Sequence, residues 1–458
     1  MFVGRKDELN NLSKFFDSDK QENIIIYGRR RIGKSELIKE ALKHSNKNFI
    51  FYQAKETTIE DNIKSLSKSI SDFFNLGAII FDSIESIFEF MFSRNEDFIF
   101  VIDEYPYLVN LEKGLDSIVQ KSIDNFKQNS RLKLVLLGSY IDIMAKLNHV
   151  DNPLNGRISS MMFINEMNYQ EVSLFYPNVE LETKVKYYSV FGGVPYYNAL
   201  IDERKSFEEN LTDIALNKNS PLSDYIEMTL SKELRKINNA NSVFSTIARG
   251  VSKFNDILSN QGNSMSSSQL SHVLNDLIGM DLLKKTTPIN ESANSRKTYY
   301  QIKDNFVDFF YKYIYRNQTE RLMMNINDFY HDFIKDDLFN KFIPKKFEDI
   351  CAQYLIIKNK NRLINSPIHK IGKYWYDNPI EKVNGEFDLV SKDKEGYIVY
   401  EVKYTNEKIN NSVINKLTKQ LEKCNVSYYN LGFFSKSGFD VNGSNEYILI
   451  HLEEIYSF

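Results

Sequence analysis

NIIIYGRRRIGKSELIKEAL, residues 23 to 42, is the stretch that decides the fold of the amino-terminal third. Residues 24 to 27 predict a short buried strand, and GRRRIGKS at 28 to 35 follows with the G-x-x-x-x-G-K-[ST] pattern of a phosphate-binding loop. Apolar residues at helical spacing come next, so a helix would direct its amino end at bound phosphates. A chance glycine-lysine turn is the alternative. We expect a nucleotide to bind Gly28, Arg29, Arg30, Arg31, Ile32, Gly33, Lys34 and Ser35.

The chemistry of this loop follows from its residue types. Backbone N–H groups of a glycine-containing loop can face phosphate oxygens, Lys34 would reach the β- and γ-phosphates, and Ser35 would bind Mg²⁺. A second apolar run, DFIFVIDEYPYL at 97 to 108, ends in Asp103 and Glu104, which would lie at the carboxyl edge of a parallel sheet. There Asp103 would hold Mg²⁺, directly or through water, and Glu104 would polarise the attacking water. The alternative for this acidic pair is a helix cap.

Two further candidates come from the next segments. LKLVLLGSY at 132 to 140 predicts a third strand that ends at Ser139, where a hydroxyl could sense a γ-phosphate. PLNGR at 153 to 157 offers Arg157 as a cation for transition-state charge. For each of them the alternative is a loop residue without a catalytic part.

Composition limits the class of protein. A chain of 458 residues predicts two to four domains, and a net charge of −3 argues against a global basic field for nucleic acid. Two cysteines, Cys351 and Cys424, fit a reduced cytoplasm and core positions, and six scattered histidines argue against zinc. No run approaches the roughly 18 apolar residues that span a bilayer. We expect a soluble cytoplasmic protein without a membrane.

The middle of the chain changes character near residue 236. Two short helical patterns lie in 241 to 260, and SSSQLSHVLNDLIGMDLL at 266 to 283 predicts a third helix with Leu270, Val273, Leu274 and Leu277 on one face. Two strands around a polar loop follow, and this order resembles a winged helix. The third helix carries no Lys or Arg from 266 to 277, which argues against phosphate contacts there. The wing could supply charge instead, from Lys284, Lys285, Arg296 and Lys297, and a protein–protein connector is the alternative.

The carboxyl-terminal part begins with a helix pattern, KKFEDICAQYLI at 345 to 356, which carries Glu348 beside its apolar face. EFDLV and YIVYEVKY, at 386 to 390 and 397 to 404, predict two paired strands that carry Asp388, Glu401 and Lys403. Two carboxylates on neighbouring strands can bind Mg²⁺, which polarises a phosphodiester and lowers the pKa of bound water. The alternative is a half-exposed hairpin with a surface ion pair, worth ~0–1 kcal/mol.

Six motifs in order carry a resemblance to the archaeal-type ATPase family, a STAND-class P-loop ATPase family related to AAA+ proteins: FVGRKDELNNL (2–12), GRRRIGKS, VIDEYPYL, LLGSY, PLNGR and FGGVPYY (191–197). The resemblance spans residues 1 to 235 and implies ATP or ADP with Mg²⁺ as cofactors. It also implies that Val3, Gly4 and Arg5 lie near the adenine or ribose, and that Gly193 and Pro195 belong to a helical lid.

The D-x₁₂-E-x-K spacing of Asp388, Glu401 and Lys403 resembles the restriction-endonuclease-like, or PD-(D/E)xK, nuclease fold. Phe387 stands where the name of the motif implies proline. The resemblance implies a metal site of Asp388 and Glu401 completed by Glu348, with Lys403 beside the attacking water. STAND-like ATPases often carry such a carboxyl-terminal domain.

The expected architecture is therefore α/β and multidomain. It has a P-loop NTPase core with a parallel sheet (1–165), a helical lid (166–235), a winged-helix-like domain (236–320) and a restriction-endonuclease-like domain (321–458). The first hypothesis is an ATPase coupled to a Mg²⁺-dependent, DNA-directed nuclease. The second is a nucleotide-dependent signalling switch that binds nucleic acid or protein without cleavage, and a transcription-regulator-like protein is a third, disfavoured by the uncharged helix. We expect nucleic acid as partner, DNA before RNA, and leave a homo-oligomer open.

Overall fold

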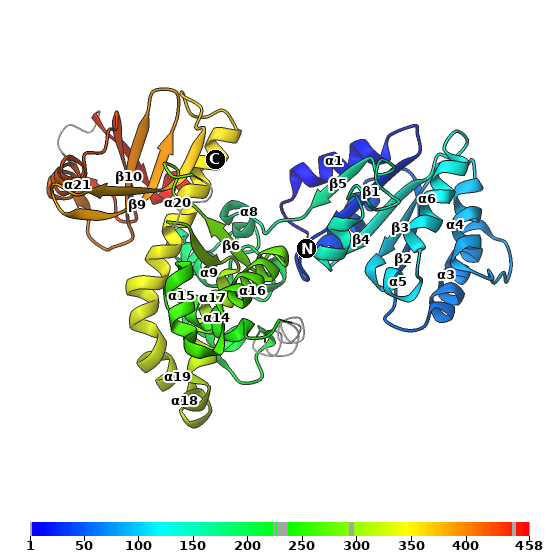
Figure 1. Cartoon of the computed structure of the whole chain (residues 1–458), viewed down its shortest axis with the longest axis horizontal. Helices are drawn as coiled ribbons and strands as arrows, with labels where there is room; N and C mark the ends of the chain where they lie inside the picture. Colours follow the sequence, from blue (N-terminus) through cyan, green and yellow to red (C-terminus); the bar gives the residue numbers. More distant parts are fainter. Residues whose placement is uncertain (1, 223–225, 227–236, 293–296, 442–445, 458) are drawn as a thin grey trace. The chain divides into compact units, whose positions relative to one another are not determined.

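The structure is a computed structural model that describes residues 2–222, 226, 237–292, 297–441 and 446–457. The chain divides into two compact units (Figure 1). The first comprises Met1–Glu166 with Gly279–Asp281, and the second comprises Met167–Ile278 with Leu282–Phe458. Among the described residues, no helix combines the length and apolarity that a bilayer crossing requires.

The first unit is built on a five-stranded parallel sheet in the order β2-β3-β4-β1-β5. Its strands are β1 (Glu22–Tyr27), β2 (Asn48–Gln53), β3 (Phe98–Asp103), β4 (Lys133–Gly138) and β5 (Ser160–Phe163). Its helices are α1 (Lys6–Phe16), α2 (Lys34–Lys43), α3 (Ile59–Phe74), α4 (Ile84–Ser93), α5 (Tyr105–Leu111), α6 (Leu115–Phe126) and α7 (Ile141–Lys146). An α/β fold with a parallel sheet, as predicted, is confirmed here.

Burial explains why these apolar runs form the centre of the sheet. Every residue of β3 and β4 is buried, which is typical of parallel strands covered on both faces. Alternate residues such as Ile25 and Phe100 pack with helices α3 to α6 in one core cluster, so their neighbours face the other side of the sheet. The carboxyl ends of β1, β4 and β3 consequently lie side by side at one edge.

The second unit begins with helices and a hairpin. Its first helices are α8 (Tyr169–Ser173), α9 (Leu181–Phe191), α10 (Pro195–Asn198) and α11 (Phe207–Leu211), and α11 continues into a π-helical turn, Thr212–Leu216. Helices α14 (Ala240–Ala248), α15 (Phe254–Gln261) and α16 (Ser267–Gly279) and the antiparallel strands β6 (Leu283–Thr286) and β7 (Tyr299–Ile302) follow in the order expected for a winged helix. Leu270, Val273, Leu274 and Leu277 are buried, as predicted. Arg296 lies outside the described residues.

An aromatic helical segment links this part to the carboxyl-terminal sheet. It comprises α17 (Asn305–Phe309), a π-helical turn (Phe310–Ile314), α18 (Gln318–Met323), α19 (Ile326–Tyr330) and the long helix α20 (Ile343–Lys360). The inward residues predicted for α20, from Phe347 to Leu355, are buried, and Cys351 and Cys424 are buried free thiols. Phe306, Phe309 and Tyr313 are buried, so the aromatic face of this segment is a packing face.

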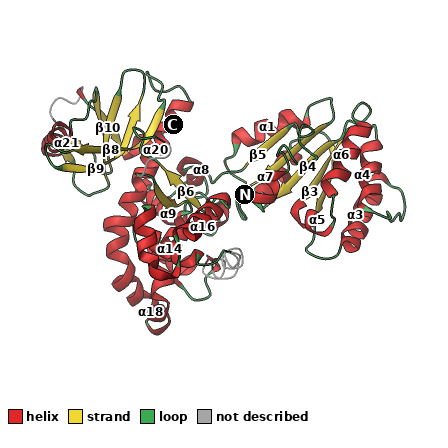
Figure 2. Cartoon of the chain, in the orientation of Figure 1, coloured by secondary structure: helices red, strands yellow, loops and turns green. Residues whose placement is uncertain are grey.

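The carboxyl-terminal sheet has the order β14-β12-β10-β9-β8 (Figure 2). The strands β8 (Lys370–Asn378), β9 (Val383–Lys392) and β10 (Tyr397–Lys403) run antiparallel, whereas β10, β12 (Asn430–Ser435) and β14 (Ile448–His451) run parallel. The remaining elements are β11 (Ile409–Asn410), α21 (Asn411–Cys424), β13 (Phe439–Asp440) and α22 (Leu452–Ile455). The predicted strand pair is present, and β8 is a strand that sequence analysis did not assign.

Candidate nucleotide-binding site and carboxylate edge

The phosphate loop is held by close backbone packing. Gly28 follows β1 with φ of 156°, and a Cβ atom there would lie 2.6 Å from the carbonyl oxygen of Ile164. Gly33 then caps α2 in the left-handed region, and Lys34 begins the helix. The loop therefore needs glycine at its start, and the amino end of α2 is directed to the loop, where helix N–H groups favour an anion.

A chain of hydrogen bonds joins the ends of three strands. The ammonium of Lys34 donates to Gly28 O and Arg29 O, both at 2.9 Å, and to Ser139 Oγ at 3.0 Å. The Ser139 hydroxyl donates to Glu104 Oε1 at 2.7 Å. Sequence analysis singled out these residues in three separate motifs, and the parallel strand order brings them together.

Local backbone geometry fixes Ser139, in the middle of this chain, and Glu104, at one end. A Cβ atom on Gly138 would lie 2.5 Å from Met144 Sδ and 2.7 Å from Pro106 Cδ, so only glycine lets α5 and α7 pack against the end of β4. Glu104 has φ of 55°, in the left-handed region that few non-glycine residues adopt. Strained backbone of this kind clusters at functional sites, and here it aims a carboxylate at Ser139.

A second contact supplies oxygen atoms suited to a metal ion. Ser35 Oγ donates to Asp103 Oδ2 at 2.6 Å, and the backbone N–H of Glu104 donates to Asp103 Oδ1 at 2.9 Å. Burial raises the pKa of Asp103, and the charge of Glu104 adds to this, while the Ser35 hydrogen bond and Lys34 act in the opposite direction. A hydroxyl and a carboxylate at one point are hard oxygen donors, so these two residues fit Mg²⁺.

The stretch before α1 contacts the same loop. Gly4 and Arg5 both have positive φ, and the buried Arg5 guanidinium donates to Asn165 O at 2.6 Å and to Ile32 O at 3.3 Å. It also pairs with Glu8 at 3.1 Å. Val3 precedes these residues and is half-buried. The structure thus places Arg5 beside the phosphate loop.

Two of the three arginines of the loop have partners that were not predicted from the sequence. Arg29 pairs with Glu166 at 2.9 Å, and Arg30 donates to the hydroxyl of Tyr140 at 3.0 Å while its guanidinium lies over the Tyr140 ring. Arg31 has φ of 63°. Tyr140 directly follows Ser139 at the end of a predicted strand, so its place near the phosphate loop could have been predicted. Nothing in the sequence pointed to Glu166.

Arg157 is not brought to this edge of the sheet, and its prediction is corrected. Its guanidinium pairs with the half-exposed Asp124 at 2.9 Å, and its carbonyl oxygen accepts a hydrogen bond from Asn23 at 2.8 Å. Asn23 lies at the amino end of β1, whereas the phosphate loop follows the carboxyl end at Tyr27. Because β5 runs parallel to β1, a residue just before β5 falls at the opposite edge from the loop.

Pro195 lies in the second unit, where it begins α10. Helix α9 ends before Gly192, whose φ is 61°, and the Asn198 side chain donates to Gly192 O and Val194 O at 2.9 Å. The backbone of Gly193 accepts a hydrogen bond from Met167 N at 2.8 Å. The FGGVPYY stretch is therefore a helix stop followed by a short helix rather than by a turn alone.

The predicted carboxylates of the second unit lie on neighbouring strands. The β9–β10 pairing ends at Tyr400 opposite Leu389, and the next position along both strands is Glu401 opposite Asp388. The β8–β9 register shifts between Gly372 and Tyr374, so Asp388 and Leu389 together oppose Lys373. This bulge brings the Lys373 ammonium to Asp388 Oδ1 at 2.7 Å and into contact with Glu386.

The acids of this edge are paired with lysines. Lys403 pairs with Glu401 on the same strand, which is the surface ion pair that the sequence left as the alternative. Burial lowers the pKa of Lys373, but the charge of Asp388 and hydrogen bonds to Asp388 and Glu386 outweigh it and raise the pKa. Lys373 and Glu386 were not predicted from the sequence. Lys373 directly precedes three aromatic residues, 374 to 376, so it is a charged residue beside an apolar run, as Lys403 is.

Glu348 on α20 faces this group. Burial raises its pKa to about 8, and the charge of Asp388 adds to the effect, while Lys373 opposes it. Glu348 and Asp388 are thus electrostatically coupled, as a shared site would require. Within the described ranges, however, no three acidic, histidine or cysteine side chains gather closely enough to hold a metal ion. The predicted ligand set of Glu348, Asp388 and Glu401 does not fit a metal as it stands.

Comparisons with known proteins agree with the first of these sites. Residues 2–201 match a family model described as an ATPase domain predominantly from Archaea, and residues 310–417 match one described as archaea bacterial proteins of unknown function. An uncharacterized protein of Methanocaldococcus jannaschii, MJECL04, is 30% identical over 414 residues, which cover 89% of this chain and 88% of the relative.

Two shorter or more distant similarities point the same way. The uncharacterized ATP-binding protein MJ0423 of the same organism is 50% identical over 44 residues, or 10% of this chain and 75% of the relative. The Walker-type ATPase PABY2304 of Pyrococcus abyssi has a TM-score of 0.53 at 19% identity, covering 68% of this chain and 96% of that chain, which shows a shared fold. The chain belongs to the family of the MJECL04 protein, and its amino-terminal part is an archaeal-type P-loop ATPase domain that binds ATP.

Proposed function

We propose that this chain is an ATP-hydrolysing switch that acts on nucleic acid. The observation that carries the proposal is the hydrogen-bonded chain from Lys34 through Ser139 to Glu104, at the sheet edge where Ser35 and Asp103 also lie. The ammonium of Lys34, the hydroxyl of Ser139 and the carboxylate of Glu104 thus lie in line beyond the carboxyl ends of three adjacent strands, β1, β4 and β3. This is the arrangement that phosphoryl transfer to water needs.

In the proposed reaction, Glu104 takes a proton from a water molecule as the water oxygen bonds to the γ-phosphorus. The bond from that phosphorus to the β–γ bridging oxygen breaks, and its electron pair leaves with ADP. Ser35 and Asp103 would hold Mg²⁺, which would offset charge on the β- and γ-phosphate oxygens. The ammonium of Lys34 now donates to the neutral carbonyl oxygens of Gly28 and Arg29, and it would donate to phosphate oxygens instead when ATP binds.

Ser139 is the proposed link between nucleotide state and conformation. Its hydroxyl lies between Lys34 and Glu104, so a γ-phosphate that draws Lys34 away changes both contacts at once. By the family resemblance, Val3, Gly4 and Arg5 would border the adenine or ribose, and Gly193 and Pro195 would belong to the lid that closes on the nucleotide. The contact of Arg5 with Ile32 O supports the first of these assignments.

For the carboxyl-terminal sheet, one candidate activity is Mg²⁺-dependent cleavage of DNA by Asp388, Glu401, Lys403 and Glu348. Two observations favour it: Asp388 lies opposite Glu401 on neighbouring strands, and the charge of Asp388 raises the pKa of the buried Glu348. The order of a helix, three antiparallel strands, a helix and a parallel strand in this domain is compatible with the proposed nuclease-like fold.

The second candidate is binding of nucleic acid or protein without cleavage. It is favoured by the lysine partners of the acids, because Lys373 contacts both Asp388 and Glu386, and Lys403 contacts Glu401. Acids neutralised by ammonium groups serve a structural role without any metal. In either case we propose DNA rather than RNA as the partner and leave assembly into a homo-oligomer to be measured.

One experiment separates the two candidates. Plasmid and single-stranded DNA would be incubated with Mg²⁺ or Mn²⁺, with and without ATP, using wild type, Glu401→Ala, Lys403→Ala and Lys34→Ala. Lys408→Ala, an exposed lysine five residues after Lys403, is the matched control. ATP hydrolysis would be measured in the same samples.

Cutting that is lost in Glu401→Ala and Lys403→Ala, but kept in Lys408→Ala, establishes cleavage. Loss in Lys34→Ala as well shows that ATP controls it. No cutting under any condition, with hydrolysis intact, leaves binding without cleavage as the function of the second unit. Absence of hydrolysis in the wild type would overturn the proposed switch itself.

A further inference from the structure

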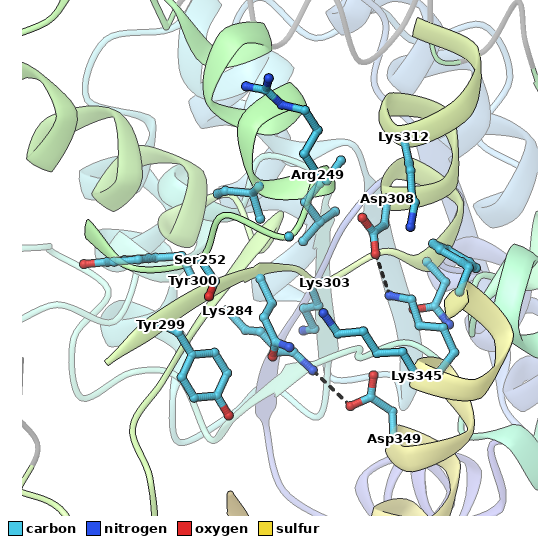
Figure 3. A pocket seen from close by; sticks show the side chains of 18 of the residues that line it. Arg249, Ser252, Lys284, Tyr299, Tyr300, Lys303, Asp308, Lys312, Lys345 and Asp349 are labelled. Atoms are coloured by element: carbon cyan, nitrogen blue, oxygen red, sulfur yellow. Dashed lines mark ion pairs between the residues drawn. The ribbon is translucent and has the colours of Figure 1, made fainter. Parts of the chain in front are cut away.

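A lysine-rich pocket of about 330 Å³ lies within the second unit (Figure 3). Its walls come from the end of α14, the β6–β7 hairpin, the aromatic segment after α17, helix α20 and strand β8. Ile289 N donates to Lys373 O at 2.8 Å, and the Asn290 side chain bonds to both the N–H and the carbonyl oxygen of Trp375. These bonds tie the hairpin loop to β8 and hold the two walls together.

The charge of this pocket is opposite to that of the whole chain. Nine lysine or arginine side chains line it against three carboxylates, in a protein whose net charge is −3. Such a local excess of positive charge in a concave surface attracts polyanions, because low-dielectric walls focus the field. The pocket is therefore built for phosphate groups rather than for a neutral or cationic ligand.

Some of these cations are committed to internal pairs and others are not. Lys346 pairs with Asp308 at 2.8 Å and Lys284 with Asp349 at 3.5 Å, and both pairs lie on the pocket wall (Figure 3). Lys312 and Lys341 pair with Asp337, and Lys373 pairs with Asp388 and Glu386. Within the described part of the chain, Lys253 and Lys345 make no ion pair, and both are exposed. Exposed ammonium groups without carboxylate partners, at the rim of a basic hollow, are available to phosphate groups.

The aromatic residues of the pocket position the cations. The Lys253 ammonium lies 4.9 Å and the Lys297 ammonium 4.8 Å from the centre of the Trp375 ring, and Lys373 lies over Tyr299 at 5.4 Å. Lys297 and Lys373 also pair with carboxylates, Glu291 and Asp388 respectively, whereas for Lys253 the cation–π contact fixes the ammonium without neutralising it. Basic grooves interleaved with aromatic side chains are typical of single-strand nucleic-acid binding.

The pocket adjoins the carboxylate edge. Lys373 and Glu386 line it, and Lys373 also contacts Asp388. Asp349, on its wall, directly follows Glu348 on α20. A phosphodiester strand in the pocket would therefore lead to the acids that the proposed function assigns to the second unit.

We infer that this pocket binds the sugar–phosphate backbone of single-stranded nucleic acid, with Lys253 and Lys345 as phosphate contacts. A duplex is too wide for a hollow of about 330 Å³, whereas one nucleotide of a single strand can enter it with its neighbouring phosphates at the rim. Lys253 follows α14 and Lys345 lies on α20, and two cations on separate walls favour successive phosphates of a strand over a mononucleotide. The role of the pocket as a path to the acids rests on the proposed function, but binding itself does not.

Binding is tested on the full chain in EDTA without ATP, so that no cleavage interferes. The probe is a fluorescent DNA strand of about 20 nucleotides, followed by anisotropy at salt concentrations from about 50 to 200 mM. The variant is Lys253→Ala with Lys345→Ala, and the control is Lys416→Ala with Lys419→Ala, two exposed lysines of α21. A duplex, an RNA strand and inorganic polyphosphate are competitors.

The pocket variant should bind about tenfold more weakly at low salt. The slope of log K against log salt should fall by about 1.4, since each single-strand phosphate contact contributes about 0.7. The control should bind like the wild type, and all variants should melt at the same temperature. Equal binding by the pocket variant and control, equal binding of duplex and single strand, or preference for polyphosphate would each overturn the inference.

The two proposals fail in different ways. A wild type that binds the strand through Lys253 and Lys345 but never cuts it supports the pocket and removes cleavage. Cutting that persists at wild-type rate and affinity in the pocket variant overturns the pocket and leaves the proposed function intact.

Discussion

The phosphate-loop edge of the first unit and the carboxylate edge of the second use the same residue types with different results. In the first, Lys34 reaches Ser139 and two backbone oxygens, and Asp103 meets a hydroxyl. In the second, Asp388 and Glu401 each meet a lysine ammonium. Opposite charges kept apart leave a site ready for an external charged ligand, whereas opposite charges brought together satisfy one another.

Glu104→Gln should have the largest effect on this comparison. The kcat of ATP hydrolysis should fall by about 10²–10⁴-fold, because the amide cannot accept the proton of the attacking water. ATP binding should persist, since the amide oxygen can still accept the hydrogen bond from Ser139. Steady-state phosphate release and nucleotide titration measure the two effects, with Glu36→Gln, an exposed acid on α2, as control. An unchanged kcat would remove Glu104 from the reaction.

Much of the first edge could be predicted because its residues sit inside contiguous motifs. Strand, loop and helix follow each other in residues 23 to 42, and parallel strands with buried runs place Asp103 and Ser139 at the same edge as Lys34. The strand order was not readable, so the Lys34–Ser139–Glu104 chain emerged only in the structure. Arg157 was misplaced because β5 was not assigned from the sequence, and the loop before a strand parallel to β1 lies at the edge of the sheet opposite the phosphate loop.

The second edge was less predictable, because its geometry depends on a register shift. The spacing of Asp388, Glu401 and Lys403 predicted the correct strand pair. The bulge in β9 opposite Lys373 is a shift in the register of the β8–β9 hairpin that no residue pattern marks, and β8 itself was not assigned. The ammonium that most affects the acids therefore could not be found from the spacing that identified them.

Lys373→Ala should leave the carboxylate of Asp388 without an ammonium partner, as Asp103 is, among the described residues, at the first edge. Loss of the hydrogen bonds to two carboxylates should cost about 1–3 kcal/mol, which lowers Tm by several degrees in metal-free buffer. If the acids can form a metal site, Mg²⁺ should restore more Tm in this variant than in the wild type. Thermal melting with and without Mg²⁺ measures both, and Lys370→Ala, exposed on the same strand, is the control. No response to Mg²⁺ in either protein would argue for a structural role of the acids.

Glu348→Gln should have a smaller effect that depends on pH. The folded protein binds a proton on Glu348 up to about pH 8, whereas the unfolded chain releases it at the ordinary pKa of the group. The stability that this proton provides therefore falls as pH rises from that ordinary value to about 8 and is constant above it. Glutamine does not titrate and avoids that loss. Between pH 6 and pH 9 the Tm of the variant relative to the wild type should therefore rise by roughly 1–2 °C.

The matched control for this variant is Glu407→Gln, an exposed acid after β10. Melting curves at both pH values test the sign. A difference in Tm between Glu348→Gln and the wild type that stays constant with pH would show that the charge of Asp388 and the burial of Glu348 do not hold the proton as inferred.

Arg157→Ala should have the smallest effect, and it tests the boundary of the first edge. Its partner Asp124 is half-exposed, and surface ion pairs contribute about 0–1 kcal/mol, so Tm should change little. Because Arg157 lies at the amino end of the strands, hydrolysis should keep its wild-type kcat. A fall in kcat of tenfold or more, at unchanged Tm, would require Arg157 to reach the nucleotide of a second copy of the chain. Repeating the assay across protein concentrations would then show the dependence that such a contact between copies produces.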